Sequence, residues 1–175
     1  MLGVDNQRDG GFAAEIDLTS NSASISRLPA SSQAPYSYAE LGMAVMLTKQ
    51  NEAWLAAIAK RGIPVSTEKD LKLIQIDPWP AGGFVYSKIP EGHRAVKCIA
   101  FLKEDETDNG YARPVQGLIA HIDLTDRKVV DIEDHGVVPM PNESGRFDSQ
   151  NPVSARTDLT DIDIIQPNGP SFKVD

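Results

Sequence analysis

The sequence has little of what marks a nucleic-acid-binding or membrane protein. Its formal net charge is −8, so it has no excess of basic side chains to meet phosphates or anionic headgroups. No stretch approaches the roughly 18 consecutive apolar residues of a membrane-spanning helix, and the amino-terminal segment lacks the apolar part of a secretory signal. We therefore expect binding to neither nucleic acid nor membrane. The compartment is not determined, although the missing signal favours the cytoplasm.

Cysteine is also scarce. Cys98 is the only one, which excludes an internal disulfide, and its position within the apolar run 96–102 predicts a buried, unreactive thiol. Motifs that mark common enzyme sites are missing as well. There is no Gly-x-Ser-x-Gly nucleophile elbow, no His-Glu-x-x-His zinc motif and no phosphate-binding loop of the Walker type. Local motifs therefore predict no catalytic residue.

Candidate metal ligands are few and scattered. The three histidines, His93, His121 and His135, fall in three different predicted segments, so no metal-binding set is predicted. His121 is expected on the polar face of a strand, either exposed or hydrogen-bonded. The acidic run 104–108 has the composition of a cation site, but consecutive carboxylates converge only in a specially shaped loop. We interpret this run as a solvated loop between strands.

A helical segment stands out in the first half of the chain. Residues 37–40, Ser-Tyr-Ala-Glu, have the pattern of a capping box at a helix start. Lys-Arg-Gly at 60–62 indicates the end, with cations in the last turn and a glycine beyond it. Asn51 is a place where a second short helix can begin. Between these limits the apolar residues form a helical stripe: Leu41, Val45, Leu47, Trp54, Leu55 and Ile58.

Strands are expected at four places after the helix: 71–77, 95–102, 116–124 and 128–134. With 175 residues and 41% hydrophobic composition, the chain can bury a substantial core. One helix followed by four strands with turn-rich connections predicts an α+β fold. In it the helix, continuous or broken, packs on a four-stranded antiparallel sheet. An extra amino-terminal hairpin and an extended carboxy-terminal tail complete the expected architecture.

A short internal repeat links two parts of the chain. Residues 14–19, Ala-Glu-Ile-Asp-Leu-Thr, recur at 120–125 as Ala-His-Ile-Asp-Leu-Thr. Each copy alternates apolar and polar residues and precedes turn-forming residues and a second alternating run, which is typical of a hairpin. A match of six residues can arise by chance. The other interpretation is that two related domains stand in tandem, of which the first is represented only by its final hairpin.

Four motifs occur in one order along the rest of the chain: Ile-Asp-Pro-Trp-Pro-Ala-Gly at 76–82, Asp-Asn-Gly-Tyr-Ala-Arg-Pro-Val at 108–115, His-Gly-Val-Val-Pro at 135–139 and Gln-Pro-Asn-Gly-Pro-Ser-Phe at 166–172. Together they resemble the amino-terminal region of the copper- and quinone-dependent primary-amine oxidases. Residues 36–147 are similar to the whole third domain of that region, which is cystatin-like in fold. The chain departs from the family at Asn168, where glutamate is usual.

The resemblance implies three segments with different origins. Residues 1–34 would be the terminal hairpin of a truncated preceding cystatin-like domain, followed by a linker. Residues 35–147 would be the cystatin-like third domain, a roll of one helix on four strands. Residues 148–175 would be a linker and the first strand of a catalytic β-sandwich whose remainder is missing.

The groups that perform the family's reaction are not in this sequence. The family needs a tyrosine in an Asn-Tyr-Asp/Glu setting, which becomes topaquinone, and copper held by three imidazoles, two of them from a His-x-His pair. None of the four tyrosines follows an asparagine, and no His-x-His occurs: the tyrosines are Tyr36, Tyr38, Tyr86 and Tyr111. The family's catalytic-base aspartate corresponds to a position beyond Asp175. The resemblance therefore implies that this chain binds neither copper nor topaquinone and is inactive alone.

The function implied is that of a non-catalytic part of a larger enzyme. The parent would convert a primary amine, O2 and water to an aldehyde, ammonia and H2O2, and would be a homodimer with copper and topaquinone. The chain's partners would then be the parent's remaining domains and, through them, a small primary amine. Two alternatives stay open: a free-standing cystatin-like binding or scaffold module without enzymatic activity, and a split enzyme whose other domains come from a second chain.

Three residues are the candidates for contact with the substrate. In the family this domain helps to form the wall of the channel through which amines reach the quinone. By the motif match, Trp79 and Tyr111 fall on loops that line this channel, and Leu41 on the helix joins them. An amphipathic aromatic side chain at a loop tip suits contact with an apolar amine tail. The alternative for each is a structural role, which for Leu41 means a place in the core.

Overall fold

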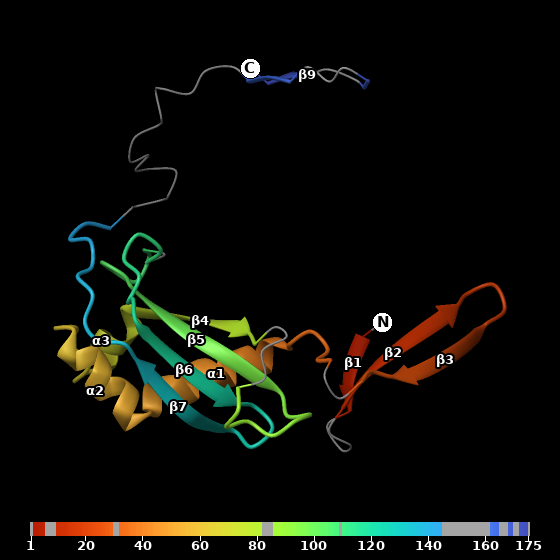
Figure 1. Cartoon of the computed structure of the whole chain (residues 1–175), viewed down its shortest axis with the longest axis horizontal. Helices are drawn as coiled ribbons and strands as arrows, with labels where there is room; N and C mark the ends of the chain where they lie inside the picture. The colour runs from red at the N-terminus through yellow and green to blue at the C-terminus, as the bar shows by residue number, and fades with distance from the viewer. Residues whose placement is uncertain are drawn as a thin grey trace.

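The computed structural model describes residues 2–5, 10–29, 32–81, 86–108, 110–144, 162–164, 168–169 and 172–174. Within these residues the strands form three antiparallel sheets, β1-β2-β3, β4-β5-β6-β7 and β8-β9, and α1 lies along one face of the second (Figure 1). The elements in chain order are β1 (Leu2–Asp5), β2 (Gly10–Asp17), β3 (Ser22–Arg27), α1 (Tyr38–Gln50), α2 (Glu52–Lys60), α3 (Glu68–Lys72), β4 (Ile74–Pro80), β5 (Ala95–Leu102), β6 (Leu118–Asp123), β7 (Lys128–Asp134), β8 (Ile162–Ile164) and β9 (Phe172–Val174).

The helices begin and end where the sequence places their caps. Ser37 and Glu40 form the expected capping box of α1. Asn51 ends α1 in an extended conformation, and its side chain accepts a 2.9 Å hydrogen bond from the Trp54 amide to start α2. Gly62, with φ +74°, follows the last turn of α2. The expected helix is therefore broken at Asn51. Among the described residues no helix has the length and apolar character needed to cross a membrane.

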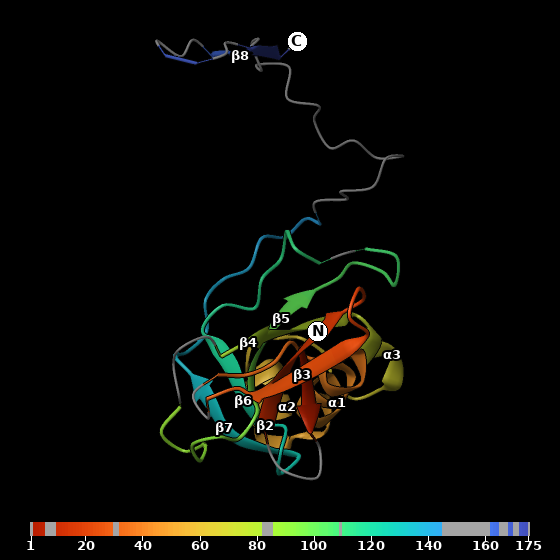
Figure 2. The same cartoon turned by 90° about the vertical axis from the view of Figure 1, so that its right-hand side faces the viewer.

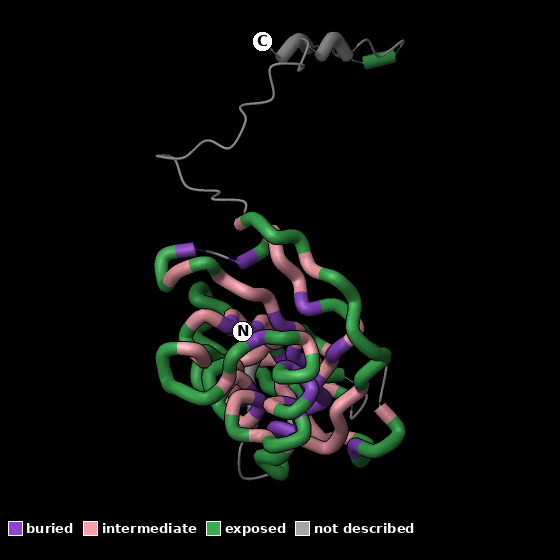
Figure 3. Tube along the Cα trace, turned by 90° about the vertical axis from the view of Figure 1, so that its left-hand side faces the viewer, coloured by how far each residue is buried: buried purple, intermediate pink, exposed green. Residues whose placement is uncertain are grey.

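The core lies between the helices and one face of the four-stranded sheet. Buried residues, coloured purple in Figure 3, include those that pack together in this layer. Ala44 and Thr48, one turn apart on α1, are fully buried, whereas the expected stripe residues Leu41, Val45 and Leu47 are only half-buried. Small side chains at the contact allow the helix to lie close to the sheet, which explains why Ala44 and Thr48, and not the larger stripe residues, are fully buried. The other main core residues are Trp54, Ile58, Ile74, Val96, Cys98, Ala120 and Ile122.

Three of the four expected strands lie within two residues of their expected limits, and β4 is the exception. The strand expected at 71–77 occupies 74–80 instead, because the short helix α3 takes residues 68–72. The strand also continues through Pro78 and Pro80. Proline is tolerated there because β4 is an edge strand of the sheet. Trp79 therefore lies on a strand and not on the loop that the sequence predicted.

The two smaller sheets hold the ends of the described chain. The expected amino-terminal hairpin is present as β2 and β3, and β1 adds a third strand to it. The hairpin extends away from the four-stranded sheet (Figure 1) and lies in front of it in the view of Figure 2. The carboxy-terminal strand expected near 162–175 is a short antiparallel pair, β8 with β9. Residues 145–161 lie outside the described residues.

Candidate functional site

The outer face of the four-stranded sheet, which points away from α1, carries two of the three candidate side chains. Side chains alternate between the two faces of each strand, so Ile74 and Ile76 point into the core and Trp79 points outward. The strand register places Trp79 opposite Lys97 on β5, Lys97 opposite His121 on β6, and His121 opposite Asp131 on β7. One cross-strand row thus crosses the whole sheet and contains an aromatic residue and three ionisable groups.

Trp79 and Tyr111 are both exposed on this face, by 56% and 55%. Tyr111 follows Gly110, whose φ of +69° turns the chain back over β5. The Tyr111 ring packs edge-on against Phe101, with ring centroids 5.0 Å apart at 87°. A hydrogen bond with the Asp77 side chain raises the pKa of the Tyr111 hydroxyl. Tyr111 is therefore a solvent-facing ring that two neighbours hold in one orientation.

Leu41, the third candidate, lies in the other layer of the fold. It is half-buried on α1, which packs on the inner face of the sheet, while Trp79 points from the outer face. It follows Glu40, whose carboxylate meets the Arg94 guanidinium at 2.5 Å just before β5. Leu41 is thus at the end of the helix layer nearest the start of β5. The structure brings Tyr111 beside the β4–β5 face but leaves Leu41 in the helix layer.

A tyrosine covers the central histidine of the outer face. The Tyr86 ring stacks on His121, with centroids 3.9 Å apart and planes inclined by 12°. Its hydroxyl donates to Asp131, which also meets the Lys88 ammonium at 2.8 Å. Under this cover His121 is only 3% exposed. His121 is hydrogen-bonded, as one of the two sequence interpretations had it, but it is not exposed.

Glu133 on β7 joins two of the three histidines. Its Oε2 lies 2.9 Å from His121 Nε2, and its Oε1 lies 2.6 Å from His135 Nε2. These hydrogen bonds, the one to His121 first, lower the pKa of Glu133. The sequence did not predict the contact of Glu133 with His121 and His135. The spacing of 133 and 135 puts both side chains on the same side of the chain at the end of β7, but the approach of His121 depends on the strand register.

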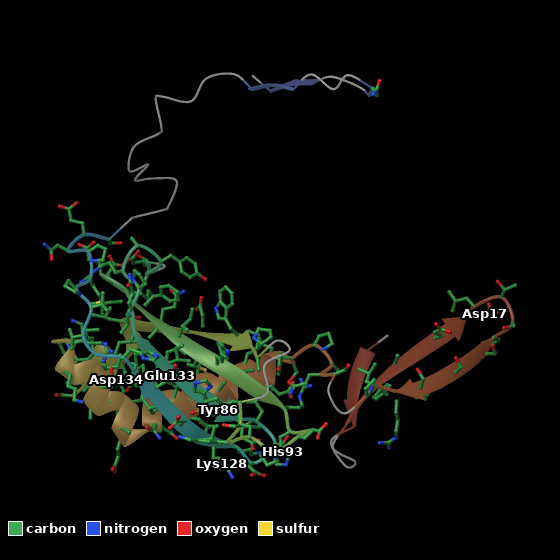
Figure 4. All side chains as sticks on the ribbon, in the orientation of Figure 1. Asp17, Tyr86, His93, Lys128, Glu133 and Asp134 are labelled. Carbon is green, nitrogen blue, oxygen red and sulfur yellow. The ribbon has the colours of Figure 1, made fainter. Side chains whose placement is uncertain are left out.

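The third histidine lies elsewhere. His93, just before β5, has its Nδ1 2.8 Å from Asp123 Oδ2 and 4.0 Å from Asp126 Oδ1. His93 and Lys128 lie at the same end of the sheet, apart from Glu133 (Figure 4). Each imidazole is therefore already engaged by a carboxylate, and the three rings do not gather. The described residues do not fit a copper centre that needs three imidazoles.

Two further expectations concern Cys98 and the acidic run. Cys98 is buried, and burial raises the pKa of its thiol to about 11, so it stays protonated and unreactive at neutral pH.

In the acidic run, Asp108 is buried and not solvated. Its Oδ2 accepts hydrogen bonds from the Glu104 amide at 2.9 Å and the Ser144 hydroxyl at 2.7 Å. The expectation of a solvated loop is wrong at Asp108, because its buried carboxylate is hydrogen-bonded to other parts of the chain.

Comparison with known proteins identifies the family. The model of the copper amine oxidase N3 domain matches residues 39–150. The chain belongs to the copper amine oxidase family. The N3 match covers α1 to β7, so the helix-covered four-stranded sheet is the family's cystatin-like N3 domain.

Several copper amine oxidases are similar over most of this chain. The primary amine oxidase of Arthrobacter sp. (strain P1) is 31% identical over 172 residues, which are 98% of this chain and 26% of that protein. The histamine oxidase of Arthrobacter globiformis is 32% identical over 147 residues, 83% of this chain and 20% of that protein. The copper-containing benzylamine oxidase of Hansenula polymorpha has a similar fold, with a TM-score of 0.55 at 16% identity over 95% of this chain and 27% of its own. This chain spans about a quarter of the first relative's length.

Proposed function

We propose that this chain is a non-catalytic part of a copper- and topaquinone-dependent primary-amine oxidase and forms part of the wall of its substrate channel. The longer protein would convert a primary amine, O2 and water to an aldehyde, ammonia and H2O2. The copper and the quinone would come from other parts of that protein, which would be a homodimer. The observation that carries this proposal is the pair of exposed aromatic residues, Trp79 and Tyr111, on one face of an N3 domain.

Trp79 and Tyr111 have the properties of channel-lining residues. Each exposes more than half of its surface, so each has apolar area to offer an amine tail. The packing of Tyr111 on Phe101 and its bond with Asp77 fix the ring before a substrate arrives, which lowers the entropy cost of binding. Leu41 is the third residue of the proposal, with a smaller expected effect because it is already half-buried.

The test uses the full-length enzyme that contains this chain. We expect Trp79→Ala and Tyr111→Ala to change the ratio of kcat/KM for a bulky amine such as benzylamine to that for methylamine by about tenfold, the effect of one or two apolar contacts. Tyr38→Ala is the matched control, because Tyr38 is 92% exposed but lies on α1 in the other layer. A ratio that neither Trp79→Ala nor Tyr111→Ala changes would exclude the channel role.

We further propose that residues 1–34 are the last part of a preceding cystatin-like domain and that 148–175 lead into the catalytic domain. The support for the first assignment is the repeated hairpin. Ala120, Ile122 and Leu124 of the second copy are buried against the helix layer, whereas Ile16 and Leu18 of the first copy are exposed. A helix like α1, packed on β2 and β3, would bury the first apolar face in the same way. The isolated chain is expected to form no H2O2 from benzylamine.

A further inference from the structure

We propose that His93, Asp123 and Asp126 bind a divalent transition-metal ion, with Zn2+ as the probe that best fits their chemistry. The three residues offer one imidazole nitrogen and two carboxylate oxygens that all lie within 4.8 Å of one another. His93 belongs to the segment before β5, Asp123 ends β6, and Asp126 lies in the turn from β6 to β7. This site is independent of the channel residues and of the proposed function.

The spacing of the three ligand atoms suits a small tetrahedral ion. Zinc bonds of 2.0–2.2 Å to nitrogen and oxygen place neighbouring ligand atoms roughly 3.3 Å apart. His93 Nδ1 is 2.8 Å from Asp123 Oδ2 and 4.0 Å from Asp126 Oδ1. Shifts of less than about 1 Å would therefore convert the present hydrogen-bonded arrangement into a three-ligand site with a fourth position open to water.

The charge at this place favours a cation. Asp123 is fully buried, with 0% of its surface exposed. Its Oδ1 accepts a 3.0 Å hydrogen bond from the Asp126 amide, and its Oδ2 faces His93. The second carboxylate, Asp126, is paired with the Lys128 ammonium at 2.7 Å. A buried carboxylate is stable only when it is paired or coordinates a metal, and a dication between the two aspartates would offset their negative charge.

The backbone around the site is held in place on both sides. The Leu124 amide donates to the Arg94 carbonyl at 2.8 Å, and the Arg94 amide donates to the Thr125 hydroxyl at 3.0 Å. These two bonds tie the segment that carries His93 to the turn that carries the aspartates. A metal would therefore meet ligands whose backbone is already positioned, which is what tight binding requires.

The types of ligand atom also indicate which metal ions the site would prefer. One imidazole with two carboxylates suits zinc and its neighbours in the first transition row. Ca2+ and Mg2+ prefer six or more oxygen ligands and gain little from an imidazole. Binding of Zn2+ without comparable binding of Mg2+ is therefore expected.

The experiment titrates the untagged 175-residue chain with Zn2+ by calorimetry and follows the ring signals of its histidines by NMR. We expect one zinc ion per chain, and a shift of the His93 ring signals only. His93→Gln and Asp126→Asn should each weaken binding at least about tenfold, as losses at metal sites usually do. Lys128→Met should tighten it about fivefold, because it removes a cation that repels the ion.

Asp131→Asn is the matched control. It also removes a carboxylate that pairs with a lysine, Lys88, on the same sheet, and it should leave zinc affinity unchanged. The proposal fails if no saturable binding appears below about 1 mM, a Kd that corresponds to only about 4 kcal/mol. It also fails if Asp131→Asn weakens binding as much as Asp126→Asn, or if zinc shifts the His121 and His135 signals instead. Asp126 is partly exposed, so its substitution leaves the fold intact.

Discussion

The turns of the hairpins β2–β3 and β6–β7 have the same local structure, although β6–β7 has a register irregularity after His121 that β2–β3 lacks. In both, the aspartate of the repeated motif ends the first strand, and it pairs with the residue that starts the second: Asp17 with Ser22, Asp123 with Lys128. Each aspartate accepts a hydrogen bond from a backbone amide of its turn. The residue before the second strand is left-handed in both, with φ 51° at Asn21 and 55° at Arg127.

The hairpins differ in what covers their apolar faces. In the second, Ala120 and Ile122 are 0% exposed beneath the helix layer; in the first, Ile16 is 57% and Leu18 is 90% exposed. Asp17 lies at the open tip of its hairpin (Figure 4), whereas its counterpart Asp123 is buried. A six-residue motif thus fixes the turn, which is local, while burial depends on a partner that the motif does not encode.

The largest expected effect is the difference in stability loss between the same substitution made at equivalent positions of the two hairpins. Ile122→Ala should lower the free energy of unfolding by about 2–5 kcal/mol, because it opens a cavity in the core. Ile16→Ala should change it by less than about 0.5 kcal/mol, because Ile16 is already exposed. Urea denaturation of the two variants measures both. Equal losses would mean that the first hairpin has a core of its own.

A smaller change in stability tests whether the two turns share their left-handed backbone geometry. Arg127→Gly should raise the free energy of unfolding by about 0.5–1 kcal/mol, because glycine adopts positive φ without the strain of a side chain. Asn21→Gly should have the same sign and a smaller size, since asparagine tolerates this conformation. Arg127→Ala controls for loss of the arginine side chain. A gain of stability at only one of the two positions would show that the turns do not share this geometry.

The smallest effect is a pH dependence that arises from Glu133 in the second hairpin. Hydrogen bonds to His121 and His135 lower the pKa of Glu133 below its usual range. In the first copy of the repeat, Glu15 stands at the place of His121. A carboxyl with a lowered pKa stabilises the fold above its ordinary pKa, and this contribution is lost as the pH falls through the lowered value. Glu133→Gln should therefore flatten the acid side of the stability profile, measured by denaturation between pH 3 and pH 6. An unchanged slope would contradict the assignment.

Local signals in the sequence predicted much of the fold. The capping box at Ser37 and Glu40 and the cap at Asn51 are side-chain-to-backbone contacts within one turn, so they can be read directly. Helix α3 was missed although Thr67 and Asp70 form a capping box, because the helix is short and has no apolar stripe. The buried line Ala44–Thr48 depends on how closely α1 approaches the sheet, which no local pattern gives.

The candidate site was predictable only where local signals determine it. The turn at Gly110 placed Tyr111 in a loop, as observed, whereas the motif match placed Trp79 on a loop where an edge strand exists. The ring of Tyr86 over His121, and the approach of His121 to Glu133, join residues 35 and 12 positions apart in sequence. Such contacts follow from strand register and from the path of a connection over the sheet, which are tertiary features.

Amide hydrogen exchange, measured residue by residue on the 175-residue chain, compares the hairpins most directly. Amides of β6 and β7 should exchange only through global unfolding, and those of β2 and β3 through local opening, roughly a hundredfold or more faster. Adding a helix that packs on Ile16 and Leu18 should remove this difference. Equal protection of the two hairpins in the chain alone would contradict the view that the first one lacks its covering helix.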